Sequence, residues 1–109
     1  MADHVFVVSE WLPKENCEKE LSTVIKKLSS LVLEKEKGCV SARVTKQISH
    51  PGSPGKSKYT IVCMQEYVNI HAFDMHCATD YVADFFKTCV ENEKTALVKE
   101  WTCRLFAED

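Results

Sequence analysis

A glutamate, a histidine and a tyrosine stand within sixteen positions of one another in the second half of the chain, as Glu66, His76 and Tyr81. An imidazole titrates near neutral pH and can serve as a general base. Glu66 follows an apolar segment, and a carboxylate among apolar neighbours needs a partner because its unpaired burial is costly. We therefore expect Glu66 to pair with His76 and orient its ring, and Tyr81 to donate to a substrate oxygen or oxyanion.

The same residues also suit a purely structural role. A bond between Glu66 and His76 would anchor a short helix to a neighbouring strand, and Tyr67 and Tyr81 would then be ordinary core or rim aromatics. If the pair is structural, His76→Ala should lower the melting temperature. If it is catalytic, turnover should fall while the melting temperature holds.

Aromatic side chains recur where they could line a pocket for a flat ring, and Tyr67 could donate a hydrogen bond there. The aromatic residues are Trp11, Phe73, Phe85, Phe86 and Trp101. An aromatic stripe at helical spacing also fits a plain hydrophobic core.

The sequence gives little support for a metal site or a phosphate-binding site. His71 and His76 are five positions apart, whereas two ligands on one helical face need a spacing of three or four. There is no glycine-rich phosphate loop and no Gly-x-Ser-x-Gly elbow. We expect no metal and no cofactor.

Hydrophobic periodicity predicts the elements that position these residues. Two prolines and two glycines in nine residues make 49–57 a flexible loop that joins two strands as a hairpin. The predicted strands are 4–12, 39–48, 58–68 and 95–106, and the predicted helices are 15–37, 70–78 and 80–91.

Several residues are expected to set boundaries and faces. Gly38 should cap the long helix, and Asn69 and Thr79 should cap the two short ones.

In the long helix an apolar stripe should face inward while Lys, Glu and Ser fill the other face. In the second strand Val40, Ala42, Val44 and Ile48 should share one face. In the last strand Leu97, Trp101, Cys103 and Leu105 should oppose Val98 and Phe106.

The order strand, helix, strand, strand, helix, strand is the split βαβ or ferredoxin-like pattern of an α+β protein. Its four antiparallel strands would carry the helices on one face. The strands have apolar residues on both faces, so the second face needs a cover. A homodimer packed through the sheets is the simplest cover.

Length and charge narrow the function classes. The 109 residues predict one domain, spanning 1–109, and a net charge of −2 argues against a nucleic-acid partner. Charges interrupt every apolar run and the start lacks signal-peptide features, so we expect no membrane partner and a cytoplasmic location. The six cysteines include no Cys-x-x-Cys pair and should be reduced thiols.

The segment from Tyr59 to Phe86 resembles the antibiotic biosynthesis monooxygenase family of dimeric α/β barrels. The resemblance rests on Glu66-Tyr67 at a strand end, Ala72-Phe73-x-x-His76 in a short helix, and Thr79 three residues later. It implies a ferredoxin-like subunit, a homodimer, and a pocket between sheet and helices. Members oxidise quinols or polyketide aromatics with oxygen and no added cofactor, while others degrade haem or isomerise sugar phosphates.

Two departures from the family pattern bear on the chemistry. Asp80-Tyr81 stands where many bacterial members have Pro-His, so a phenol replaces an imidazole. The first strand has Ser9 and Glu10 but not the Asn of the haem-degrading branch, which disfavours haem degradation.

We therefore expect a cofactor-independent monooxygenase acting on a small phenolic or quinol-type substrate. Two alternatives stay open. One is a non-catalytic dimeric ligand-binding or interaction module. A closed, fully packed interface between sheet and helices would exclude the enzyme and leave this module, whereas an open cavity touching His76 would support the enzyme. An isomerase of a small polar metabolite predicts a polar cavity with Arg43 or Arg104 at its mouth.

Overall fold

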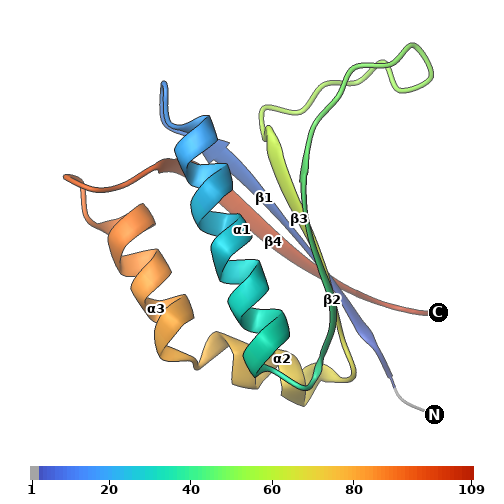
Figure 1. Cartoon of the computed structure of the whole chain (residues 1–109). Helices are drawn as coiled ribbons and strands as arrows, with labels where there is room; N and C mark the ends of the chain where they lie inside the picture. The colour runs from blue at the N-terminus through green and yellow to red at the C-terminus, as the bar shows by residue number, and fades with distance from the viewer. Residues whose placement is uncertain (1–2) are drawn as a thin grey trace.

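The computed structural model describes residues 3–109, and Figure 1 shows its elements in chain order. They are β1 (Val5–Pro13), α1 (Glu18–Lys35), β2 (Cys39–Lys46), β3 (Ile61–Tyr67), α2 (Ile70–Cys77), α3 (Asp80–Phe86), the π-helical turn η1 (Lys87–Glu91) and β4 (Val98–Ala107). The predicted order is confirmed, with η1 continuing α3 through the predicted range 80–91.

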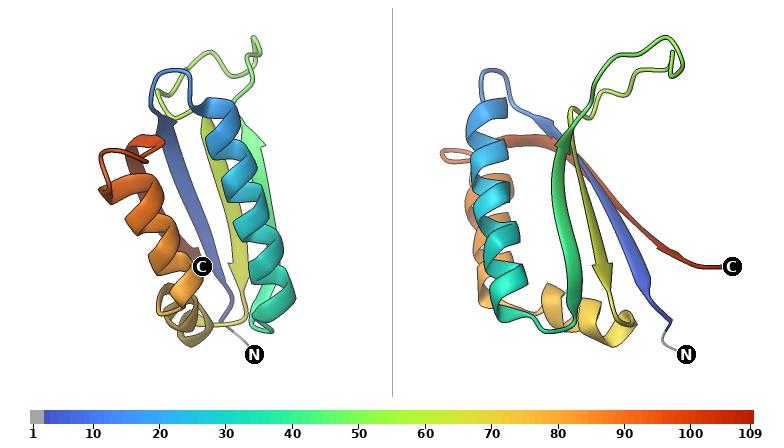
Figure 2. Two further views of the ribbon diagram at one scale, coloured as in Figure 1. Left: turned by 60° about the vertical axis from the view of Figure 1, so that its left-hand side comes forward. Right: turned by 45° about the vertical axis from the view of Figure 1, so that its right-hand side comes forward.

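The four strands form one antiparallel sheet in the order β2-β3-β1-β4. Figure 2 shows that the helices lie on one face of this sheet and leave the other face bare. This is the predicted ferredoxin-like α+β arrangement. No helix among residues 3–109 combines the length and the apolar character needed to span a membrane.

Helix α1 packs on the sheet through the predicted apolar stripe, with Leu21, Ile25 and Val32 buried. Two serines depart from the prediction. Ser22 and Ser29 are buried on the same inward face. Because a serine occupies little volume, it brings the helix close to the sheet or leaves space beneath it.

Helix α1 ends earlier than predicted, and Gly38 has a different role from the expected left-handed cap. The cap residue is Glu36 in an extended conformation, and its N–H donates to the carbonyl of Val32 at 2.8 Å. None of the glycines among residues 3–109 has a positive φ. A Cβ on Gly38 would lie 2.6 Å from the Cβ of Ala72, so glycine is needed for the close approach of α2.

The short helices begin as predicted. The Asn69 side chain accepts a hydrogen bond from the N–H of Ala72 at 2.8 Å. Thr79 occupies the N-cap position of α3, but its hydroxyl donates to the carbonyl of His76 at 2.8 Å. Thr79 thus joins the two helices rather than capping the second.

Two register shifts reverse the predicted faces of single residues. The pairing of β2 with β3 shifts between Cys39 and Ser41, so Cys39 is buried and Val40 is exposed. The pairing of β1 with β4 shifts between Leu12 and Pro13, so Val98 is buried beside Leu97 instead of opposing it. Ile48 lies beyond the end of β2 and is also exposed.

The segment 47–60 joins β2 to β3 and projects from the sheet as an arm (Figure 1). The Gln47 side chain closes its base by accepting from the Ser57 N–H at 2.9 Å and donating to the Ser57 carbonyl at 2.8 Å. The predicted loop 49–57 lies within this arm.

We expect Gly38→Ala to lower the free energy of unfolding by about 1–3 kcal/mol, because the added methyl overlaps Ala72. The matched control is Gly55→Ala, where a Cβ meets nothing within 4 Å and stability should change by less than about 1 kcal/mol. Urea unfolding of the three proteins measures the difference, and equal effects at both glycines would contradict the close approach.

Candidate functional site

A cavity of about 430 Å³ lies between the sheet and the helices. Its floor is built from the helix-facing side chains of β3, β1 and β4. Val7, Ser9 and Trp11 of the middle strand, β1, lie in this floor, with residues of β3 and β4 on either side. Its roof comes from all three helices, through Leu28, Ser29, Phe73, His76, Phe85 and Phe86. The interface between sheet and helices is therefore not closed and fully packed, and the cavity borders His76.

Aromatic rings make up much of the cavity wall. Trp11 meets Phe85 edge-on with ring centroids 5.4 Å apart, and it stacks on Trp101 at 5.4 Å with planes 14° apart. Phe86 lies 4.9 Å from Trp101. Trp11, Phe73 and Phe85 line the cavity, and a flat apolar molecule fits such walls.

His76 reaches the cavity from the last turn of α2 and is 9% exposed. Its Nδ1 lies 3.0 and 3.1 Å from the two carboxylate oxygens of Glu36. Phe73 and Tyr67 flank the ring, with centroids 6.0 and 5.4 Å away. An ionised carboxylate only accepts hydrogen bonds, so the hydrogen of this contact is on Nδ1, and in the neutral imidazole the lone pair is then on Nε2.

Glu36 holds a second donor besides His76. The Tyr81 hydroxyl donates to the Glu36 carboxylate, whose side chain is 13% exposed. Burial and the adjacent Glu36 raise the pKa of Tyr81 to about 12, so Tyr81 is a neutral donor at neutral pH. Glu36 follows α1 and Tyr81 lies in the first turn of α3, so the three side chains connect all three helices.

The predicted pairing of Glu66 with His76 is wrong. Glu66 lies on the bare face of β3 with Val62 and Met64, as strand alternation predicts, and it pairs there with His4. His76 packs on the opposite, helix-covered face. Since side chains alternate along a strand, no local adjustment brings Glu66 to the imidazole.

Tyr81 and Tyr67 also take positions that differ from their predicted roles. The Tyr81 hydroxyl is engaged with Glu36, and Tyr81 does not line the cavity. Tyr67 is completely buried behind the cavity wall, and its hydroxyl donates to Gln65 Oε1 at 2.9 Å. Burial raises the pKa of Tyr67 far above its ordinary value.

The cavity lacks the features of a site for a polar metabolite. His76 is the one ionisable nitrogen base on its wall within the described residues, and no Lys, Arg, Asp or Glu lines it. Arg104 donates to Glu10 at 2.5 Å on the bare face, and Arg43 pairs in register with Met64 on that face. The expectation of an arginine at the cavity mouth is therefore wrong. No cluster of three metal-ligating side chains is found within 3–109.

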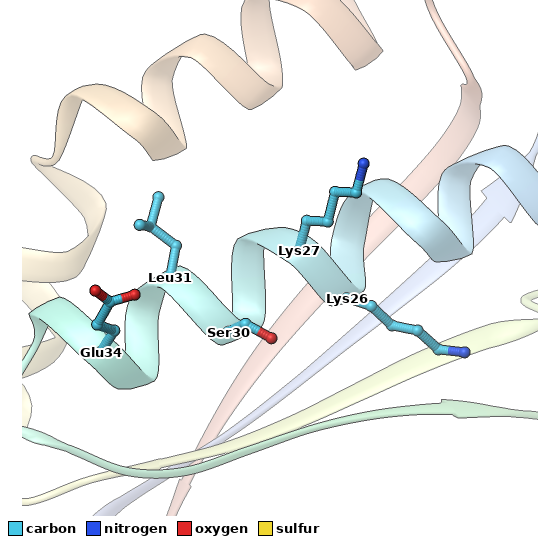
Figure 3. A pocket seen from close by; sticks show the side chains of 5 residues that line it. All are labelled: Lys26, Lys27, Ser30, Leu31 and Glu34. Atoms are coloured by element: carbon cyan, nitrogen blue, oxygen red, sulfur yellow. The ribbon is translucent and has the colours of Figure 1, made fainter.

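Figure 3 shows a second depression, along the outer side of α1. Its lining consists of Lys26, Lys27, Ser30, Leu31 and Glu34. All five side chains come from a single helix, and no other element contributes a group to this depression. It is a solvated helix face and carries no argument for a site.

Solved structures share this architecture over nearly the whole chain. A conserved protein from Methanosarcina mazei matches with a TM-score of 0.77 and 20% identity, over 99% of this chain and 95% of its own. A Caulobacter crescentus protein, provisionally named an antibiotic biosynthesis monooxygenase, matches with a TM-score of 0.76 and 16% identity, over 99% and 92%. The chain therefore shares its fold with a protein that carries this provisional name.

A further match is a dimeric protein of unknown function and ferredoxin-like fold from Bacteroides fragilis. Its TM-score is 0.73 at 11% identity, over 96% of both chains. No protein-family model and no curated protein sequence matches the chain. The resemblance found in residues 59–86 is thus confirmed at the level of the fold.

Sequence reasoning missed Glu36. It stands in the run Glu34-Lys35-Glu36-Lys37, which is typical of a solvated helix end. The sequence feature that could have identified Glu36 is its position in the helical repeat of α1. The buried positions Ile25, Ser29 and Val32 are spaced by four and three residues, and the next step of four arrives at Glu36.

We expect Glu36→Ala to lower the free energy of unfolding by about 1–3 kcal/mol, because it leaves His76 and Tyr81 without their shared acceptor. Glu66→Ala is the matched control. It removes a partly exposed pair on the bare face and should cost less than about 1 kcal/mol. Chemical denaturation measures both, and an equal or larger loss at Glu66 would contradict the assignment.

Proposed function

We propose that this protein is a cofactor-independent monooxygenase that acts on a small phenolic or quinol-type ring bound in the cavity. The observation that carries the proposal is His76, whose Nδ1 is tied to Glu36 while the ring borders an apolar, aromatic cavity. Nε2 is then the free base that a bound ring hydroxyl would meet.

In the proposed reaction, His76 Nε2 takes the proton of a substrate hydroxyl. The resulting anion is electron-rich enough to give an electron to molecular oxygen, and an oxygen atom joins an activated ring carbon. For an anthrone-like substrate, that CH2 carbon becomes a carbonyl. One O2 is consumed and one water is released per turnover. Apolar walls favour this path because they weaken the solvation of the anion and leave it reactive.

Glu36 takes the orienting role that the sequence assigned to Glu66. Its carboxylate fixes the tautomer of His76 and stabilises the imidazolium that forms when the proton arrives. Tyr81 is a positioning residue, because it holds Glu36 and does not line the cavity. Glu66 has no part in this proposal.

Oxygen uptake tests the proposal with a panel of quinols and anthrone-like phenols. We expect His76→Ala to reduce uptake by about 10²–10⁴-fold, which is the usual contribution of a general base. Glu66→Gln is the matched control and should keep the wild-type rate. Uptake that persists in His76→Ala, or that falls equally in Glu66→Gln, would overturn the assignment.

A non-catalytic dimeric ligand-binding module is the second candidate. It is favoured by the position of Glu36, His76 and Tyr81, which join three helices as a structural clasp would. Under this alternative an aromatic ligand quenches the fluorescence of Trp11 and Trp101 without any oxygen uptake. Uptake by the wild type that requires His76 would exclude it.

We also propose a homodimer packed through the bare face of the sheet, in a cytoplasmic setting suited to the six free thiols. Met64 is 47% and Phe106 is 50% exposed on that face, and Phe6 and Val8 lie between them in register. The Bacteroides fragilis neighbour is described as dimeric, which supports a dimer.

Met64→Lys should weaken the dimer roughly tenfold or more, because it adds a cation beside Arg43 and the neighbouring Arg104. Leu33→Lys is the matched control, since Leu33 is 46% exposed on α1, away from the bare face. Sedimentation at several concentrations measures both. A monomeric wild type, or equal weakening by both variants, would contradict the interface.

A further inference from the structure

Three thiols line the cavity, and the proposed oxygenation uses none of them. Ser9 of β1 pairs in register with Cys63 of β3 on one side and with Cys103 of β4 on the other. The two cysteines are therefore two strands apart on the cavity floor, with their Cα atoms roughly 9–10 Å from each other. Cys77 is the last residue of α2 and directly follows His76. The thiols therefore come from the floor and the roof of one space.

The three thiols differ in access. Cys63 is 4% exposed, and its burial raises the pKa to about 11. Cys103 is half-buried and Cys77 is exposed. Cys77 and Cys103 are thus the two thiols that a molecule in the cavity can reach, while Cys17, Cys39 and Cys89 do not line it.

Both accessible thiols are protonated at neutral pH. Burial raises the pKa of Cys77, and the nearby Cys103, Asp74 and Glu36 raise it further. Burial also raises the pKa of Cys103. A protonated thiol reacts slowly with reagents in solution. Fast reaction therefore requires that the cavity bind the electrophile beside the sulfur, because binding raises its effective concentration there.

The cavity is built to hold one class of partner. Its walls are aromatic and aliphatic, and no Lys, Arg, Asp or Glu among residues 3–109 lines it. His76 lies on the same wall, is 9% exposed and has its Nδ1 bonded to Glu36. A soft sulfur nucleophile, a base and flat apolar walls together suit an uncharged aromatic ring that carries an electron-poor double bond.

We propose that Cys77 and Cys103 form a covalent capture site for aromatic Michael acceptors of the quinone or aryl-maleimide class. The Sγ atom forms a bond to one carbon of the acceptor double bond, whose π bond breaks. The thiol proton passes through His76 to the acceptor, so nothing leaves and no oxidant is consumed. This inference shares the cavity of the proposed function but not its reaction with oxygen.

Differential labelling tests the site. The intact protein is treated without oxygen with N-phenylmaleimide or N-ethylmaleimide, and each cysteine is followed by peptide mass spectrometry. The rates at Cys77 and Cys103 are divided by the rate at Cys17, which lies outside the cavity and cancels the intrinsic reactivity of each reagent. We expect these ratios to be roughly tenfold higher for the phenyl reagent, because the cavity holds its ring.

A pair of neighbouring serines provides the matched variants. Ser29 is buried on the cavity wall, whereas Ser30 is exposed on α1 and does not line this cavity. Ser29→Leu should fill the cavity and abolish the phenyl preference, and Ser30→Leu should keep it. Ala83→Leu fills the cavity from the more exposed α3, in case Ser29→Leu unfolds the protein.

Equal ratios for the two reagents would overturn the inference, since Cys77 would then be only an exposed thiol. A phenyl preference that survives Ser29→Leu or Ala83→Leu in the folded protein would also overturn it. Failure of the proposed function is distinguishable. Selective labelling without oxygen uptake by any quinol leaves the capture site standing, and uptake without selective labelling leaves only the oxygenase.

Discussion

The arrangement of the helices depends on one largely buried carboxylate. Glu36 lies at the end of α1 and accepts from His76 in α2 and from Tyr81 in α3. A carboxylate that is 13% exposed is destabilising unless donors replace the water it loses. The two donors satisfy it, and in doing so they tie together the ends of three helices at one end of the sheet (Figure 1).

The same constraint sets the chemistry of the cavity. Glu36 binds Nδ1 of the imidazole, and the ring borders the space between sheet and helices. Tyr81 stays neutral because burial and Glu36 raise its pKa to about 12, so it does not compete as a base. The cavity beside His76 contains aromatic rings and thiols but no group of fixed charge among the described residues. A base in such surroundings suits a substrate whose anion reacts with an uncharged molecule such as O2.

Local patterns predicted the elements and most of the faces, because periodicity follows directly from which side chains must be buried. The inward positions Trp11, Phe73, Phe85 and His76 were found in this way. What the patterns missed depends on long-range geometry. The bulge beside Cys39 reverses the face of Val40, and Gly38 is required by a contact with Ala72, far along the chain. The choice of partner for His76 also follows from the fold, since strand alternation places Glu66 on the opposite face.

The tautomer of the His76 ring tests most directly whether Glu36 leaves Nε2 free as the proposed base. Two-bond ¹H–¹⁵N correlation spectra of the histidine side chains assign the proton on each neutral imidazole. We expect His76 to carry its proton on Nδ1 and Glu36→Ala to lose this preference. A ring protonated at Nε2 in the wild type, or a tautomer unchanged by Glu36→Ala, would contradict it.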